Sequence, residues 1–278
     1  MEETPMSPRF FDVHSHINDA RFDGDRISVI EHTLRDGVFT ISVGTDRRSS
    51  QLVTQLAEFY DGMYSSIGIH PTDNTKERFN EKYFTELSSS RKVVAVGECG
   101  LDYLRAADAS ADEKKRQKDL FETQIEFAVR IGKPLMVHCR LAHSDAIDIL
   151  SSKKREHGDK LWGNIHFFSA GPDIAKQYLE LGFSMSFSGV ITFARDYDDA
   201  VRYIPLDMIM SETDSPYAAP VPFRGKRNEP LYVEEVVKKI AEIRGESLET
   251  VAPALVSNAF RVFKIESNKA NQALGVRH

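Results

Sequence analysis

Short apolar, β-branched runs alternate along the chain with longer stretches of helical periodicity. The runs are nearly continuous in apolar residues, as parallel strands buried on both faces are. They occupy residues 10–16, 38–43, 63–70, 92–98, 134–138, 162–167, 183–187 and 206–213. Between them, apolar residues recur at helical spacing, as in Ile27, Ile30 and Leu34 before Gly37, Leu52, Leu56 and Phe59, Phe121, Ile125 and Ala128 before Gly132, and Ala175 and Leu179 before Gly182. The pattern predicts strands and helices in alternation.

Eight strand and helix units in about 250 residues predict an α/β protein with the (β/α)8 architecture of a TIM barrel. An open doubly wound sheet is the alternative, but no glycine-rich phosphate loop follows the first run. Residues 231–263 are expected to close the outer ring of helices, because Val233, Val236, Val237 and Ile240 have helical spacing. We predict a single barrel domain over residues 1–265 and a flexible tail over 266–278.

Composition limits the class of protein. A hydrophobic fraction of 41% and a charged fraction of 28% are typical of a folded globular chain. Thirty-six basic against 42 acidic residues give a net charge of −6, which argues against coating nucleic acid by charge alone. No apolar run approaches the ~20 residues of a membrane span, and residues 1–9 lack the apolar stretch of a secretory signal. With only Cys99 and Cys139 as thiols, we expect a cytoplasmic protein.

Residues that can bind metals lie at the ends of the apolar runs. They are His14 and His16, His70, Glu98, His138, His166 and Asp214. A single histidine is more often structural than a ligand, but the carboxyl ends of parallel barrel strands meet at one rim, where active sites form. His14 and His16 lie two residues apart, so their side chains leave the same face of the strand. The pattern predicts a metal centre, because acids at the edge of a core are costly unless they meet cations.

The set His14, His16, Glu98, His138, His166 and Asp214 exceeds what one tetrahedral ion takes. Mixed imidazole and carboxylate ligands suit zinc, manganese or magnesium. Two divalent ions that share one carboxylate would use the whole set and leave positions for water and substrate. Glu98 is the expected bridge, since its run lies between those of the other ligands. The prediction is a hydrolytic centre with two divalent metal ions.

Several motifs carry a family resemblance that extends over nearly the whole chain. They are Phe-Asp-Val-His-Ser-His at 11–16, Ile-His-Pro at 69–71, Gly-Glu-Cys-Gly-Leu-Asp-Tyr at 97–103, Val-His-Cys-Arg at 137–140, Ser-Glu-Thr-Asp-Ser-Pro-Tyr at 211–217, Arg-Gly-Lys-Arg-Asn-Glu-Pro at 224–230 and Asn-Ala-Phe at 258–260. With these motifs in order, the chain resembles the TatD family of metal-dependent deoxyribonucleases, within the amidohydrolase-like barrels.

The resemblance implies a division of the ligands between two metals. One would be held by His14, His16, Glu98 and Asp214, and the other by Glu98, His138 and His166. This chain departs from the family's usual His-Cys-Phe-Ser-Gly at Phe167 and Ala170, so the loop after His166 is expected to differ in shape. It also has Leu141 where the family often has Asp, so a polar contact near the substrate is expected to be missing.

The function expected from this resemblance is hydrolysis of phosphodiester bonds in DNA. Water activated by two metals would attack phosphorus, with Glu98 and Asp214 as catalytic residues and Asp214 also accepting the proton of the water. His70 would orient a phosphate or support a ligand, or is a packed histidine. Phosphate contacts are predicted for Arg140 and for Arg224, Lys226 and Arg227, although a basic run is usually a solvated face.

Aromatic residues and thiols near the ligands have two possible roles each. Tyr103 and Phe168 are placed where an aromatic face could stack on a base, or they pack in the core. Cys99 and Cys139 each follow a predicted ligand, and strand alternation is expected to turn them into the core.

The partner expected from this reasoning is DNA, as a single strand or an end, with removal of nucleotides in the 3′–5′ direction. The alternative within hydrolases is a metal-dependent esterase or amidase on a small substrate such as a D-aminoacyl-tRNA ester. A barrel that has lost catalysis and serves as a binding module is a third hypothesis. No membrane and no obligate protein partner are predicted, and a barrel with closed edges favours a monomer.

Overall fold

The computed structural model describes residues 7–73, 75–104 and 110–266. Its strands are β1 (Phe10–Ser15), β2 (Val38–Val43), β3 (Met63–Ile67), β4 (Val93–Asp102), β5 (Leu135–Arg140), β6 (Gly163–Ile165), β7 (Phe183–Phe187) and β8 (Ile209–Ser211). All pair in parallel, in the order of the sequence. This order gives a barrel and excludes the doubly wound alternative.

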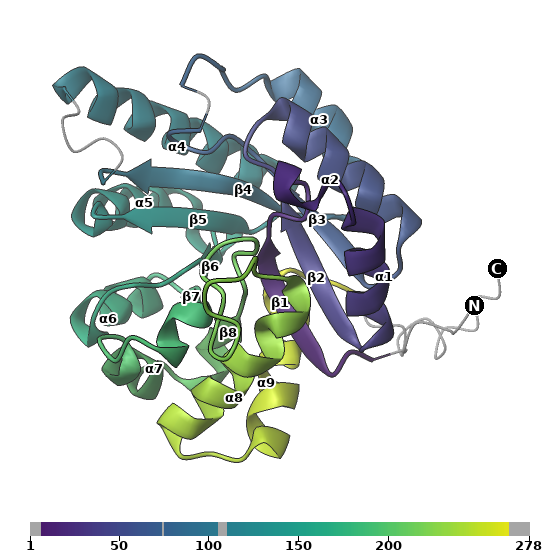
Figure 1. Ribbon diagram of the computed structural model, residues 1–278. Coiled ribbons are helices and arrows are strands. Elements are labelled where there is room, and N and C mark those ends of the chain that lie inside the picture. The colour runs from purple at the N-terminus through teal and green to yellow at the C-terminus, as the bar shows by residue number, and fades with distance from the viewer. Residues whose placement is uncertain (1–6, 74, 105–109, 267–278) are drawn as a thin grey trace, which may run out of the picture.

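Helices lie outside the strands, as Figure 1 shows. They are α1 (Arg26–Arg35), α2 (Arg47–Phe59), α3 (Glu81–Ser88), α4 (Ala111–Ile131), α5 (His143–His157), α6 (Pro172–Glu180), α7 (Asp198–Tyr203), α8 (Val233–Arg244) and α9 (Leu248–Val262). Short 3-10 turns lie at Ala20–Phe22, Gly158–Lys160, Gly189–Thr192, Leu206–Met208 and Pro230–Tyr232. Within the described residues, no helix has both the length and the apolar character to cross a membrane.

The barrel is closed by the segment that follows β8. Ser15 and Ser215 form a parallel bridge. The backbone N–H of Asp214 donates to the carbonyl of His14 at 2.8 Å, and that of His16 donates to Ser215 at 2.7 Å. These bonds join β1 to the other end of the sheet. Two predicted ligand segments, far apart in the sequence, are therefore held side by side.

Apolar side chains of the strands and of the inner helix faces form the core. In α8 the predicted residues Val233, Val236, Val237 and Ile240 are all buried, and the predicted tail from 267 onward lies outside the described residues. The predicted face of α2 is wrong in one respect, since Phe59 is 83% exposed. The helix instead buries small residues, including Ser50, whose hydroxyl contacts Gly68 of the loop after β3.

Candidate metal centre

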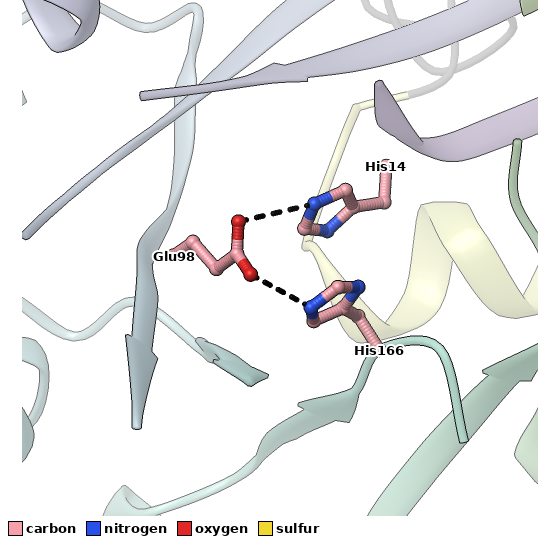
Figure 2. A group of neighbouring side chains, drawn as sticks. All are labelled: His14, Glu98 and His166. Atoms are coloured by element: carbon pink, nitrogen blue, oxygen red, sulfur yellow. Dashed lines mark hydrogen bonds and ion pairs between the residues drawn. The ribbon is translucent and has the colours of Figure 1, made fainter. Parts of the chain in front are cut away.

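The predicted ligands converge at the carboxyl ends of the strands. His14 comes from β1, Glu98 from β4 and His138 from β5, while His16, His166 and Asp214 lie just beyond β1, β6 and β8. Figure 2 shows His14 and His166 pointing at the carboxylate of Glu98 from one side of the barrel. All are buried or partly buried, as expected of groups at the mouth of a barrel.

Each oxygen of Glu98 faces a different set of histidines. Oε2 lies 3.5 Å from His14 Nε2 and 3.4 Å from His16 Nε2. Oε1 lies 2.8 Å from His138 Nδ1 and 2.9 Å from His166 Nε2. Glu98 therefore lies between two histidine sets. We call the set of His14 and His16 the Oε2 side, and the set of His138 and His166 the Oε1 side.

Asp214 completes the set on the Oε2 side. Its Oδ1 lies 3.3 Å from His16 Nε2 and 3.7 Å from His14 Nε2. The residue has φ of 53°, a left-handed conformation that non-glycine residues rarely adopt and that recurs at functional sites. The bond from its backbone N–H to His14 fixes this turn, so the carboxylate is directed toward the histidines of β1.

Irregular pairing positions the ligands on β1 and β4. The register shifts between Asp12 and Ser15 in β1, and between Val96 and Cys99 in β4. Each shift inserts one extra residue, which bends the strand and redirects its side chains. At Gly100 an added Cβ would lie 2.0 Å from the carbonyl oxygen of His138, so this close approach of β4 and β5 requires glycine.

Two further carboxylates, Asp102 and Glu212, lie behind the histidines of the Oε1 side. His138 Nε2 is 3.1 Å from Asp102 Oδ2, and His166 Nδ1 is 3.4 Å from Glu212 Oε1. Glu212 is fully buried and also accepts hydrogen bonds from the backbone of Phe167 and the hydroxyl of Ser186. Carboxylates placed in this way fix the tautomer and orientation of a ligating imidazole.

His70 belongs to the same side. Its Nε2 lies 3.5 Å from Glu98 Oε1, and its Nδ1 lies 3.0 Å from Asp73 Oδ1. The ring is only 4% exposed and meets His138 edge-on at 4.5 Å between centroids. The structure therefore places His70 against the ligands, in a packed position from which it can support them.

The charges of the centre are strongly coupled. Burial alone would raise the pKa of the Glu98 carboxyl, but His166, His70 and the other histidines hold that pKa well below its usual range. Burial opposes ionisation of Asp214 too, yet the hydrogen bond with His16 lowers its pKa. The pKa of His14 is lowered by burial and by the neighbouring His166. These neighbours therefore favour the ionised form of both carboxyls, which is the form that can ligate a cation.

These residues fit divalent metal ions. The Nε2 atoms of His14 and His16 lie 3.2 Å apart, as do His138 Nδ1 and His166 Nε2. Two imidazole nitrogens that converge beside a carboxylate oxygen can act as a ligand set, since both can present lone pairs to one cation. Three groups at the centre place one potential ligand atom of each member within 4.8 Å of the others: His14, Glu98 and His166; His14, His16 and Asp214; and His70, Asp102 and His138. The first two groups share His14.

A cavity of about 380 Å³ opens over the centre. Its other walls come from the end of β5, with Cys139 and Arg140, and from the loops after the strands, with Asn18, Asp19, Thr45, Asp73, Phe167, Ser169, Tyr197 and Tyr217. Phe167 has φ of 47° and departs from the family's usual cysteine, and its ring belongs to this wall. The cavity thus combines carboxylates and histidines with one guanidinium and three aromatic side chains.

The predicted phosphate contacts separate into two groups. Arg140 is exposed and lines the cavity. Arg224, Lys226 and Arg227 are absent from the described cavity wall. Arg227 is held by ion pairs to Asp25 and Glu229, at 2.7 and 2.8 Å. The guanidinium of Arg224 stacks 3.7 Å from the centroid of the Phe193 ring. Phosphate contact by Arg224, Lys226 and Arg227 stays a prediction. The ion pairs of Arg227 and the stacking of Arg224 on Phe193 disfavour it.

The residues considered for base stacking pack elsewhere. Tyr103 donates its hydroxyl to Asp145 at 2.6 Å and does not line the cavity. Phe168 is 3% exposed and contacts other rings of the core, so the packing alternative holds for it. Cys99 is fully buried, as expected. Cys139 is 6% exposed and belongs partly to the cavity wall, which its core assignment did not include.

Sequence reasoning missed the carboxylates behind the histidines. The predicted fourth run ended at Glu98, whereas β4 continues to Asp102. Asp102 lies four residues after Glu98 and so shares its face of an extended strand. Glu212 lies two residues before Asp214, and the same periodicity could have marked it. Both signals were present, but acids beyond the expected strand ends are common in loops.

A parallel barrel with histidines and carboxylates gathered at its carboxyl-terminal rim defines a metal-dependent hydrolase of the TIM-barrel type. Comparison with known proteins narrows this class. A family model described as TatD related DNase matches residues 11–264. The chain belongs to the TatD family of metal-dependent hydrolases.

Relatives match over most of their length. The metal-dependent hydrolase YabD of Bacillus subtilis, itself uncharacterized, is 38% identical over 92% of this chain and 99% of its own. YcfH of Escherichia coli, also an uncharacterized metal-dependent hydrolase, is 35% identical over 84% of this chain and 86% of its own. The crystal structure of YjjV, a TatD homologue from Escherichia coli, superposes with a TM-score of 0.83 at 29% identity, covering 93% and 99% of the two chains.

Proposed function

We propose that the chain is a nuclease that uses two divalent metal ions, magnesium, manganese or zinc, to remove nucleotides from the 3′ end of single-stranded DNA. The observation that carries the proposal is the position of the Glu98 carboxylate. Its Oε2 faces His14 and His16, and its Oε1 faces His138 and His166. A carboxylate in this position would be a shared ligand of two cations, which together would supply the chemistry of two-metal phosphodiester hydrolysis.

His14, His16, Glu98 and Asp214 would hold one ion, and Glu98, His138 and His166 the other. Divalent ions bound there supply a nucleophile at neutral pH and neutralise charge on the phosphoryl oxygens. The family description, TatD related DNase, supports DNA as the substrate class.

The chain's own residues have distinct tasks in this proposal. Asp214 borders the cavity and its pKa is lowered by the hydrogen bond with His16, so its carboxylate would accept the proton that the attacking water loses. Arg140 provides the guanidinium that binds a phosphate group at the cavity mouth. Phe167, Tyr197 and Tyr217 offer apolar surface to the sugar and base of the terminal nucleotide. Asp102 and Glu212 keep the imidazoles of His138 and His166 oriented.

The test uses protein stripped of metal and a single-stranded oligonucleotide labelled at its 5′ end. Addition of Mg²⁺, Mn²⁺ or Zn²⁺ should give a ladder of products that shorten one nucleotide at a time, and Asp214→Asn should abolish it. Glu122→Gln is the control, because this acid lies on α4 outside the centre. Absence of cleavage with every metal, together with turnover of a D-aminoacyl-tRNA, would replace the proposal by the esterase alternative.

A further inference from the structure

A shallow hollow lies beside the active cavity, at the starts of α2 and α3. Its wall contains four basic residues, Arg47, Lys76, Arg78 and Lys82, against two acids, Glu77 and Glu81. Both acids are already engaged, since Glu77 pairs with Arg47 at 2.8 Å and Glu81 with Arg130 at 2.9 Å. The hollow therefore has an excess of positive charge on a protein whose net charge is −6.

Three of these bases are exposed and have no ion pair with any described residue. They are Lys76, Arg78 and Lys82. On the β8 side of the rim, Arg227 pairs with Asp25 and Glu229, whereas Arg224 and Lys226 are exposed without an ion pair to a described residue but line neither the cavity nor the hollow. Unpaired bases gathered in a concave surface attract anions more strongly than bases whose charge is neutralised by a neighbour.

The hollow is joined to the cavity through the backbone. Thr45 lines the cavity, and α2 begins two residues later at Arg47. On the other side, the loop after β3 places His70 and Asp73 in the cavity and then continues to the hollow. The Glu77 carboxylate accepts from the backbone N–H of Arg47 at 3.0 Å, which ties the two segments together.

An aromatic ring lies among the bases. Phe79 lines the hollow and is partly buried. Its ring stacks on Phe84 at 4.5 Å between centroids, which holds it in place. Basic side chains around a fixed aromatic ring match the combination by which single-stranded nucleic acids are bound without sequence preference, through the backbone and the base faces.

We propose that this hollow binds the uncleaved part of a single-stranded nucleic acid whose terminal nucleotide occupies the cavity. Lys76, Arg78 and Lys82 contact the phosphates of the bound strand. They therefore increase the affinity for a polymer and have no effect on the hydrolysis of a small diester. The inference rests on the proposed nuclease function. It also places the phosphate contacts on bases that follow β3, and not on the arginines that follow β8.

The experiment compares two triple variants. K76A/R78A/K82A removes the bases of the hollow, and R91A/R155A/K160A removes three exposed bases from the segments before β4 and β6, on the opposite face of the barrel. Both change the net charge equally. Activity of the metal-loaded protein is measured on an oligothymidylate of about 20 nucleotides and on bis(4-nitrophenyl) phosphate.

The hollow variant should raise KM for the oligonucleotide by about tenfold or more and reduce the slope of log kcat/KM against log salt by about 2, since single strands contribute ~0.7 per phosphate contact. Its kinetics on the small diester should stay within about twofold of the original, and the control variant should match the original chain on both substrates. Equal losses in the two triple variants would overturn the inference, because general charge would then explain them.

Binding without catalysis separates this inference from the function on which it rests. Anisotropy of a fluorescent oligothymidylate, measured with metal-free protein in EDTA, should show weaker binding only for the hollow variant. If the original chain hydrolyses neither substrate, the nuclease proposal fails while the binding result still decides the role of the hollow. Unchanged anisotropy in the hollow variant, or binding of phosphatidylserine vesicles but not of the oligonucleotide, would overturn the inference.

Discussion

The two oxygens of Glu98 divide the centre into sides that are built differently. On the Oε2 side, His14 and His16 come from one short segment, and Asp214 stands beside them. On the Oε1 side, His138 lies within β5, and His70 and His166 follow β3 and β6. Each histidine of the Oε1 side has a second carboxylate at its other ring nitrogen, namely Asp73, Asp102 or Glu212.

The Oε2 side lacks this support at one of its histidines. His14 Nδ1 is buried and has no hydrogen-bond partner among the described residues. Its ring is instead fixed by stacking on His166, with centroids 3.8 Å apart. Packing and close spacing along the chain thus orient the ligand from β1, whereas buried carboxylates orient those from β5 and β6. The two sides should respond differently to the same kind of mutation.

The largest effect is expected where the two sides meet. Glu98→Gln removes the charge that faces both histidine sets and leaves converging imidazoles without a shared anion. We expect kcat/KM for DNA to fall by more than the ~100-fold typical of losing a partner behind a ligand. Elemental analysis after dialysis should show loss of metal from both sides. Retention of full metal content would contradict the bridging role.

A single-sided change tests whether the sides are independent. Asp214→Asn should lower kcat strongly, since it removes the carboxylate that we propose accepts the proton of the attacking water. It should remove metal only from the Oε2 side, so the metal content should fall by half. The matched variant is His138→Ala on the other side. If either variant empties both sides, the centre binds its ions as one cooperative unit.

The supporting carboxylates give the sharpest contrast between the sides. Glu212→Gln should weaken metal binding on the Oε1 side by about 10–100-fold, because an amide can no longer hold the His166 imidazole in one orientation by charge. Asp102→Asn should act in the same direction through His138. Isothermal titration calorimetry with Mn²⁺ should show that one metal site is weakened and the other is unchanged. Equal weakening of both sites would show that these acids support the fold as a whole.

Much of this architecture follows from the sequence pattern. The predicted second and seventh runs coincide with β2 and β7. Each comes directly after a glycine that follows a helix, Gly37 or Gly182, and each is short and rich in β-branched or aromatic residues, a pattern typical of a strand. The eighth run, predicted over 206–213, contains only a short strand, Ile209–Ser211. Its first residues form a 3-10 turn after Pro205, a local preference that hydrophobicity does not encode.

The metal-ligating residues could be predicted from the sequence, whereas the local geometry and ion pairs around them could not. Histidines and acids at strand ends follow from topology, since all carboxyl ends share one rim. The bulges that direct His14 and Glu98 depend on pairing with β2 and β5, which one segment alone does not encode. Whether a basic residue is available to substrate depends on its neighbours in space. Arg227 and Lys76 both read as basic residues in the sequence, yet within the part of the chain that the structure describes Arg227 pairs with carboxylates and Lys76 does not.

A histidine away from Glu98 provides the smallest effect and a reference for the others. His143, at the start of α5, lies beside the hydroxyl of Tyr178 at 3.1 Å. Burial lowers the pKa of its imidazole to about 4, against an ordinary value near 6.5. Among the described residues, no carboxylate lies at either of its ring nitrogens to offset the desolvation, unlike at His138 and His166.

The sign of its pH dependence follows from this shift. Between about pH 6.5 and pH 4 the unfolded chain binds a proton at His143 that the folded chain excludes, so the free energy of unfolding falls as pH falls through this range. Above pH 6.5 both states are neutral and the effect vanishes. His143→Gln cannot titrate, and urea denaturation at a series of pH values should show a flatter profile in this variant. Identical profiles would mean that His143 accepts its proton in the folded protein, and that burial without a carboxylate does not keep a histidine of this barrel neutral.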